Sequence, residues 1–228
     1  MHAAVPAVAA LGWAPPLSCV LNGETRGITL TPVILHIGTH KTGSTYLQQW
    51  LVRNRDSLAL DGFNTVRNLT HAHRAAVESI EVKFPAHRLA PEFLKHDLAP
   101  ILLDLKSQEI TNKPVAVVSS EYYWNADPKR ILDFYESHGM RIIKVICFVR
   151  RQDRLLASGY NQSVKALGKS DTFSFSSYSP AFDWSGILER WRQAAPKAEI
   201  SLRGYDLHRR KGTLLRHGLL GRRDQPAP

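Results

Sequence analysis

Apolar residues along the chain form short runs that alternate with sets at helical spacing. Short β-branched runs predict strands at residues 32–37, 114–119 and 142–149. Helical spacing predicts helices at about residues 44–54, 128–138, from 151 onward, and 183–194. Buried strands that alternate with helices are typical of a parallel sheet covered on both sides. The pattern therefore predicts an α/β fold with three layers and a mostly parallel central sheet.

The other segments carry weaker patterns. Residues 61–113 are predicted to be mostly helical, with Pro91 at a helix start and apolar residues at helical spacing after it. Residues 199–202 predict an edge strand. A leader at 1–28 and an Arg- and Gly-rich tail at 208–228 show no periodic core face. We therefore expect one domain at 29–207, with a disordered or loosely packed leader before it and a poorly patterned basic tail after it.

Composition and charge narrow the functional classes. The net charge of +10 predicts a surface that attracts anions. Basic residues are not interleaved with aromatic ones in a compact stripe, so we expect no nucleic-acid partner. Two cysteines, Cys19 and Cys147, predict neither a disulfide framework nor a zinc site and fit a cytoplasmic protein. The apolar leader contains three prolines and no preceding basic residue, so neither a signal peptide nor a membrane span is expected.

Glycines at positions 38 and 43 bracket a tight loop between the first predicted strand and the next helix. Free backbone N–H groups and the helix dipole favour phosphate binding in such a loop. The loop also contains Lys41 and several hydroxyl side chains, which strengthen the prediction of a phosphate site. An ordinary strand-to-helix turn, with Ser44 as the N-cap, has the same glycine spacing and is the alternative.

The position of the lysine separates this loop from that of a nucleoside triphosphatase. There, the lysine directly follows the second glycine, and the next hydroxyl residue binds magnesium. Here Ser44 occupies the lysine position, and Lys41 lies two residues before Gly43. A kinase or ATPase would therefore lack its main phosphate-binding cation.

Residues 40–47 resemble the 5′-phosphosulfate loop of sulfotransferases that use 3′-phosphoadenosine 5′-phosphosulfate (PAPS). The family pattern, Lys-[Ser/Thr]-Gly-[Ser/Thr]-[Ser/Thr], is matched at all positions from Lys41 to Thr45. The resemblance implies that Lys41 contacts the bridging oxygen of the phosphosulfate, and that no metal is required. Tyr46 stands where cytosolic members carry a tryptophan that packs on the adenine, and an aromatic ring there is compatible with that role; a core residue is the alternative. The resemblance also implies that the 5′-phosphate is bound by backbone and hydroxyl donors of Thr42, Gly43, Ser44 and Thr45.

The family has a second phosphate element, an arginine at a strand end and a serine eight residues later on the next helix. Arg150 and Ser158 have this spacing and follow the apolar run at 142–149. A guanidinium and a hydroxyl so placed can converge on one phosphate, which the resemblance implies is the 3′-phosphate. The alternative is a solvated basic helix start. Residues 210–212, Arg-Lys-Gly, also match a late 3′-phosphate triplet of cytosolic members.

A base must take the proton of the acceptor in sulfuryl transfer. Active sites of parallel sheets lie at the carboxyl ends of strands, so Glu121, just after the second predicted strand, is the candidate. A helix-cap or surface carboxylate is the alternative for Glu121. Family members that act on carbohydrates often use a glutamate and cytosolic members a histidine, so His71 and His73 also remain candidates. His36, inside the first predicted strand, is expected to be a core residue.

The sequence thus predicts an enzyme that moves a sulfuryl group from PAPS to a hydroxyl or amine of a carbohydrate or another small molecule. Two alternatives stay open: a catalytically impaired nucleotide-binding relative, and a nucleoside or sugar kinase. Turnover of the sulfate donor tests the first alternative, and magnesium-dependent ATP binding tests the second. The sequence predicts neither the acceptor nor the oligomeric state.

Overall fold

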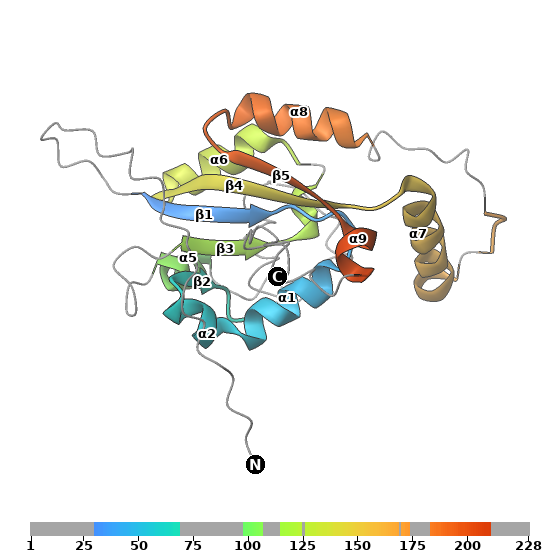
Figure 1. The fold of residues 1–228 in the computed structure, drawn as a ribbon, viewed down its shortest axis with the longest axis horizontal. Coiled ribbons are helices and arrows are strands. Elements are labelled where there is room, and N and C mark those ends of the chain that lie inside the picture. Colours follow the sequence, from blue (N-terminus) through green and yellow to red (C-terminus); the bar gives the residue numbers. More distant parts are fainter. Residues whose placement is uncertain are drawn as a thin grey trace, which may run out of the picture.

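Parallel strands form the centre of the protein (Figure 1). The computed structural model describes residues 30–68, 98–106, 115–124, 126–168, 170–173 and 183–210. Within them the sheet has five strands in the order β2-β3-β1-β4-β5, and every neighbouring pair is parallel. The strands are β1 (Thr31–His36), β2 (Phe63–Thr65), β3 (Val115–Ser119), β4 (Met140–Val149) and β5 (Glu199–Gly204).

Helices cover both faces of the sheet, with α6 and α8 above it and α1 and α2 below it in Figure 1. The three layers confirm the predicted α/β fold. The helices are α1 (Ser44–Arg53), α2 (Arg55–Leu60), α5 (Leu98–Lys106), α6 (Pro128–Ser137), α7 (Gln152–Leu167), α8 (Trp184–Ala194), α9 (Tyr205–Arg210) and a short 3-10 helix, η3 (Glu121–Tyr123). Over the described residues, no helix combines the length and apolar character needed to cross a membrane.

Alternate side chains of the central strands enter two separate apolar clusters. Val33 and Leu35 of β1 pack in one cluster with residues of α5, α6 and α8. Ile34, between them, packs in the other cluster with residues of α1 and α2. This alternation explains why the strands appear in the sequence as continuous apolar runs, because both faces of each strand are buried.

The chain reverses its direction of travel across the sheet at β1. From β1 it proceeds to β2 and β3 on one side, and it then crosses to β4 and β5 on the other. Loops that follow the carboxyl ends of strands at such a switch point form the usual ligand crevice of open α/β sheets. The glycine-bracketed loop that follows β1 lies at this point.

Two elements differ from the sequence predictions. Residues 61–113 were predicted as mostly helical, but Phe63–Thr65 forms strand β2 at the sheet edge. The pattern was also predicted to end near residue 207, but Tyr205–Arg210 forms helix α9. Both elements are short, so their own hydrophobic periodicity is too brief to identify them. The leader, the Pro91 helix start and residues 211–228 lie outside the described residues.

Candidate functional site

The loop between β1 and α1 has an unusual backbone. Gly38 and Gly43 have φ angles of 79° and 76°, and Lys41 has a φ of 64°, which is uncommon for a residue with a side chain. The buried Thr42 hydroxyl donates to the carbonyl oxygen of Thr39 at 2.6 Å and so closes the loop on itself. Because the Thr42 hydroxyl donates its proton within the loop, Thr42 can donate to a ligand only through its backbone N–H.

The loop is also fastened to the neighbouring strand β4. The N–H of Thr39 donates to the carbonyl oxygen of Phe148 at 3.2 Å, and the Cys147 thiol donates to the carbonyl oxygen of Gly38 at 3.3 Å. Burial raises the pKa of Cys147 to about 12, so the thiol stays protonated and remains a donor. The loop backbone is thus fixed at the carboxyl edge of the sheet.

Helix α1 begins without a side-chain cap. Its N-cap is Gly43, and the N–H of Leu47 makes the first helical hydrogen bond, to the carbonyl oxygen of Gly43 at 3.0 Å. Among the described residues, no backbone acceptor faces the N–H groups of Ser44, Thr45 and Tyr46. The alternative that Ser44 is the N-cap is therefore wrong, and the helix start has N–H groups free to donate to an anion.

The side chains of the loop are exposed to different degrees. Ser44 is buried, Lys41 is half-buried, and Thr45 is exposed. Within the described chain, the Lys41 ammonium has no carboxylate partner. The Tyr46 side chain is 59% exposed, so Tyr46 is not a core residue and its ring is open to a ligand.

Glu121 lies directly against this loop. A Cβ built on residue 38 would come within 2.8 Å of the Glu121 Cα, so only glycine allows the approach. The N–H of Ser120 donates to the carbonyl oxygen of His36 at 3.1 Å, and the Ser120 hydroxyl accepts the N–H of Tyr122 at 3.3 Å. These bonds fix the start of η3, and with it the backbone of Glu121, at the carboxyl end of β3.

The negative charge of Glu121 influences several neighbouring groups. Burial lowers the pKa of His36 to about 4, although the Glu121 charge opposes this shift. The pKa of His40 is also lowered, chiefly because its ring loses water, while Glu121 raises it and Lys41 lowers it. Burial and Glu121 together raise the pKa of Tyr122. The Glu121 carboxylate and the Lys41 ammonium therefore shift the pKa of His40 in opposite directions.

His36 is a core residue, as predicted. Its side chain is fully buried, and its Nδ1 lies 2.8 Å from the Ser119 hydroxyl on the adjacent strand. Its ring packs edge-on against Phe148 of β4. His36 therefore joins the three central strands immediately below the loop.

Arg150 follows the last residue of β4 and lies at the same sheet edge as the loop. Its side chain is 18% exposed, and its Nε lies 3.5 Å from an Asp206 oxygen. Its guanidinium carbon is 5.5 Å from the centre of the Tyr205 ring. Arg154 also approaches Asp206, at 3.4 Å. Helix α9 thus supplies a carboxylate and an aromatic ring that hold Arg150 near the loop.

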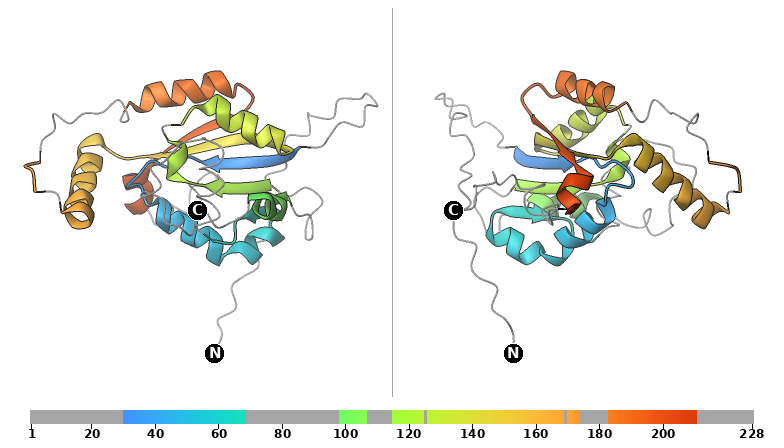
Figure 2. Two further views of the ribbon diagram at one scale, coloured as in Figure 1. Left: turned by 180° about the vertical axis from the view of Figure 1, so that it is seen from behind. Right: turned by 45° about the vertical axis from the view of Figure 1, so that its right-hand side comes forward.

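Ser158 lies on α7, which stands away from the sheet in Figure 1 and in the left view of Figure 2. Ser158 follows the buried Leu155 by three residues, so both lie on one side of the helix. Within the described residues, the Ser158 hydroxyl has no hydrogen-bond partner, so no hydrogen bond joins it to Arg150. The predicted pairing of Arg150 and Ser158 on one phosphate stays a prediction.

Most of the remaining candidate residues cannot be placed relative to the loop. His71, His73, Lys211 and Gly212 lie outside the described residues, and of Arg210 only the backbone is described, at the end of α9. In the part of the chain that is described, no group of three or more His, Cys, Asp or Glu side chains is placed to hold a metal ion.

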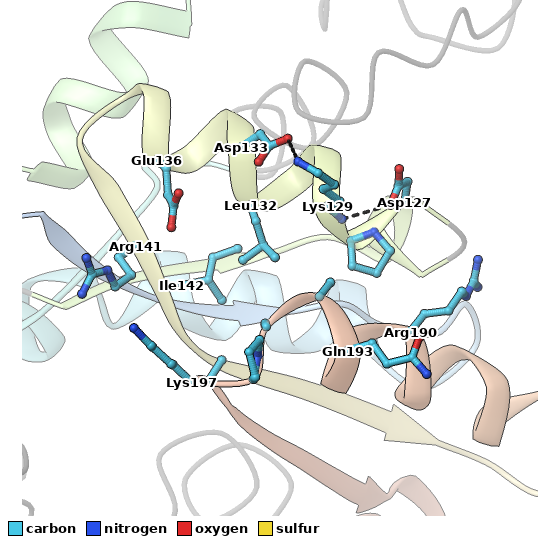
Figure 3. Close-up of a pocket in the computed structure, with 15 residues that line it drawn as sticks. Asp127, Lys129, Leu132, Asp133, Glu136, Arg141, Ile142, Arg190, Gln193 and Lys197 are labelled. Carbon is cyan, nitrogen blue, oxygen red and sulfur yellow. Dashed lines mark hydrogen bonds and ion pairs between the residues drawn. The ribbon is translucent and has the colours of Figure 1, made fainter.

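A separate groove of about 670 Å³ lies between α6 and α8 (Figure 3). It reaches Arg141 and Ile142 at the start of β4 and residues 195–198 before β5, at the amino ends of the strands. Its lining mixes charges of both signs, including an ion pair of Lys129 with Asp133 at 2.7 Å. The groove is therefore not part of the loop site, which lies at the carboxyl ends of the strands.

Sequence reasoning missed two residues at the site. Gln48 of α1 donates hydrogen bonds to Ser119 and Glu121, and Asp206 pairs with Arg150. Gln48 could have been recognised from the sequence, since it is a polar residue between Leu47 and Leu51 on the apolar side of a predicted helix. Asp206 could not, because nothing in its local sequence indicates that it contacts the end of β4.

Comparison with known proteins gives a fold relationship. No protein-family model matches the chain. Over 90 residues it is 41% identical to an uncharacterized protein of Archaeoglobus fulgidus, a match that covers 40% of this chain and 24% of that protein. The structure resembles a crystal structure of a sulfotransferase from Alicyclobacillus acidocaldarius, with a TM-score of 0.54 and 13% identity, over 79% of this chain and 76% of that one. The chain therefore has a sulfotransferase-like α/β fold.

Proposed function

We propose that the chain is a sulfotransferase that uses PAPS as the donor and a hydroxyl or amine of a carbohydrate or another small molecule as the acceptor. The observation that carries the proposal is the close approach of Glu121 to Gly38, because it joins a carboxylate to a lysine-bearing phosphate loop. The sulfotransferase-like fold supports it. A cytoplasmic location is part of the same prediction from the sequence.

The donor is a substrate, and the residues of the loop suit its two charged ends. The free N–H groups at the start of α1 would bind the 5′-phosphate, with Ser44 and Thr45 beside them and the Tyr46 ring open to the adenine. Arg150 would bind the 3′-phosphate in exchange for part of its contact with Asp206. No step in this scheme requires a metal ion.

Each of the two candidate catalytic groups has one task in the transfer. The acceptor oxygen or nitrogen forms a bond to sulfur while the bond from sulfur to the bridging oxygen breaks, and 3′,5′-adenosine bisphosphate leaves. Glu121 would take the acceptor proton. Lys41 would stabilise the negative charge that develops on the bridging oxygen. This arrangement supports in-line sulfuryl transfer.

Sulfate transfer from PAPS to a panel of phenols, amines and sugars, with a metal chelator present, tests the proposal. We expect turnover by the wild type and a loss of about a hundredfold or more in Glu121→Gln at neutral pH. Part of that loss should return at high pH, where the acceptor ionises without a base. Magnesium-dependent transfer of phosphate from ATP would instead identify a kinase. Binding of the bisphosphate without any turnover would identify an impaired relative.

A further inference from the structure

Gln48 is a buried polar side chain on the apolar side of α1. It is 2% exposed and lies between Leu47 and Leu51, both of which belong to the core. Burial of an amide is costly unless its polar atoms find partners. The presence of glutamine at this position therefore needs a specific explanation.

Both amide hydrogens of Gln48 point toward the end of β3. Its Nε2 donates to the carbonyl oxygen of Ser119 at 3.1 Å and to Oε2 of Glu121 at 3.0 Å. The reverse orientation would place the amide oxygen against two acceptors, a carbonyl and a carboxylate, so only the observed orientation satisfies this geometry. One side chain thus binds the strand end and the Glu121 carboxylate together.

The other end of the amide does not explain its burial. Among the described residues, the Gln48 Oε1 atom has no hydrogen-bond partner, although it is buried. An unpaired buried acceptor is destabilising, and an apolar side chain of the same shape would avoid that penalty. The two hydrogen bonds donated by Gln48 are therefore the feature that glutamine supplies and a hydrocarbon side chain does not.

We propose that Gln48 is a positioning residue for Glu121, a proposal that rests on the function inferred above. Its amide holds the carboxylate beside the loop in one orientation and favours the ionised form, which is the form that accepts a proton. Because α1 begins at Gly43, Gln48 also connects the helix that binds the donor to the group that activates the acceptor.

The test is a kinetic comparison of Gln48→Met with Gln49→Met. Methionine keeps the length of glutamine but has no N–H donor, and Gln49 is exposed on the same helix. We expect kcat to fall about tenfold to a hundredfold in Gln48→Met, with KM for the donor little changed. The acid limb of the kcat profile should move to higher pH, because the carboxylate loses a hydrogen bond to its charged form. Gln49→Met should match the wild type.

A double-mutant cycle with Glu121→Gln separates the possible outcomes. Gln48→Met should cause no further loss in a Glu121→Gln background, since its effect passes through that carboxylate. Equal losses in both backgrounds would overturn the positioning role. Normal turnover in Gln48→Met with impaired Glu121→Gln would overturn it too, but would leave the proposed base in place. Normal turnover in both single variants would overturn the proposed base and the positioning role together.

Thermal stabilisation by 3′,5′-adenosine bisphosphate shows that each variant is folded. Gln48→Asn provides a second variant if Gln48→Met does not fold. It keeps the amide but is one methylene shorter, so its N–H groups fall short of Glu121. The same drop in kcat and the same shift of the acid limb are expected. A Gln48→Asn enzyme with the wild-type pH profile would contradict the proposal.

Discussion

The two proposed phosphate elements lie at the same edge of one sheet but are held in different ways. The loop after β1 is tied to β4 by the Thr39 and Cys147 hydrogen bonds and is packed against Glu121. Arg150, at the end of β4, is held by Asp206 and Tyr205 of α9. Ser158 lies on α7, which stands apart from the sheet (Figures 1 and 2).

The difference indicates which element is formed before a ligand binds. Backbone hydrogen bonds and close packing fix the loop, so it loses little conformational entropy when an anion binds. In the proposed 3′-phosphate element, Arg150 is held by an ion pair, whereas the Ser158 hydroxyl has no hydrogen-bond partner among the described residues. We therefore expect that substitutions in the loop affect catalysis strongly, and that substitutions at α7 affect binding weakly.

Removal of the loop cation should have the largest effect. Lys41→Ala should lower turnover about a hundredfold to a thousandfold, the range for loss of one preorganised donor. Donor binding should fall less, because the N–H groups of α1 remain. Steady-state kinetics and calorimetric binding measure the two effects, with Lys165→Ala on the exposed part of α7 as the control. Equal losses in turnover and binding would make Lys41 a general phosphate ligand.

The buried histidine below the loop should make stability depend on pH. The unfolded state binds a proton at His36 near its usual pKa of 6.5, whereas the folded state binds it only near pH 4. The unfolded state thus holds more protons between these values, so the free energy of unfolding falls as pH falls through this window. The slope from this group is about 1.4 kcal/mol per pH unit, or about 3 kcal/mol in all.

Urea unfolding at several pH values, for the wild type and His36→Asn, tests this dependence. The variant should be less stable at pH 7 because it loses the packing on Phe148. It should also lose less stability than the wild type between pH 6 and pH 5. Parallel curves for the two proteins would show that another group is responsible for the pH dependence.

Replacement of Arg150 should lower the affinity for a nucleotide that has a 3′-phosphate but not for one that lacks it. Charge-assisted contacts to phosphate contribute about 1.5 to 3 kcal/mol, so Arg150→Ala should weaken 3′,5′-adenosine bisphosphate by roughly ten- to a hundredfold. Adenosine 5′-phosphosulfate lacks the 3′-phosphate and should bind almost as before. Arg151→Ala is the matched control, because that side chain pairs with Asp153 on the exposed surface. Equal weakening of both ligands would show that Arg150 has a structural role instead.

The serine on α7 should have the smallest effect. A neutral hydrogen bond contributes about 1 kcal/mol, so Ser158→Ala should weaken the bisphosphate by about fivefold. That result would mean that α7 approaches the ligand in the complex. Ser163→Ala, five residues further along the same helix, is the control. Identical affinities for Ser158→Ala and the wild type would restrict the 3′-phosphate element to Arg150.

The loop was predictable from the sequence because its features are local. Glycines bracket it, Lys41 and the hydroxyl residues lie within it, and a strand and a helix of clear periodicity flank it. The placement of Glu121 beside the loop was predictable only through a general rule on strand ends in parallel sheets. The short elements β2 and α9 were not predictable, because each is too brief to show its own periodicity and β2 forms only by pairing with β3.

The amino-acid sequence by itself determined the α/β alternation, the buried character of the central strands and the composition of the loop. These follow from periodicity and backbone preferences, which act over a few residues. Only the tertiary structure decided that Gln48 meets Glu121, 73 residues away, and that Asp206 meets Arg150. Such pairs depend on strand order and helix placement, since the order β2-β3-β1-β4-β5 brings together segments that no local pattern connects.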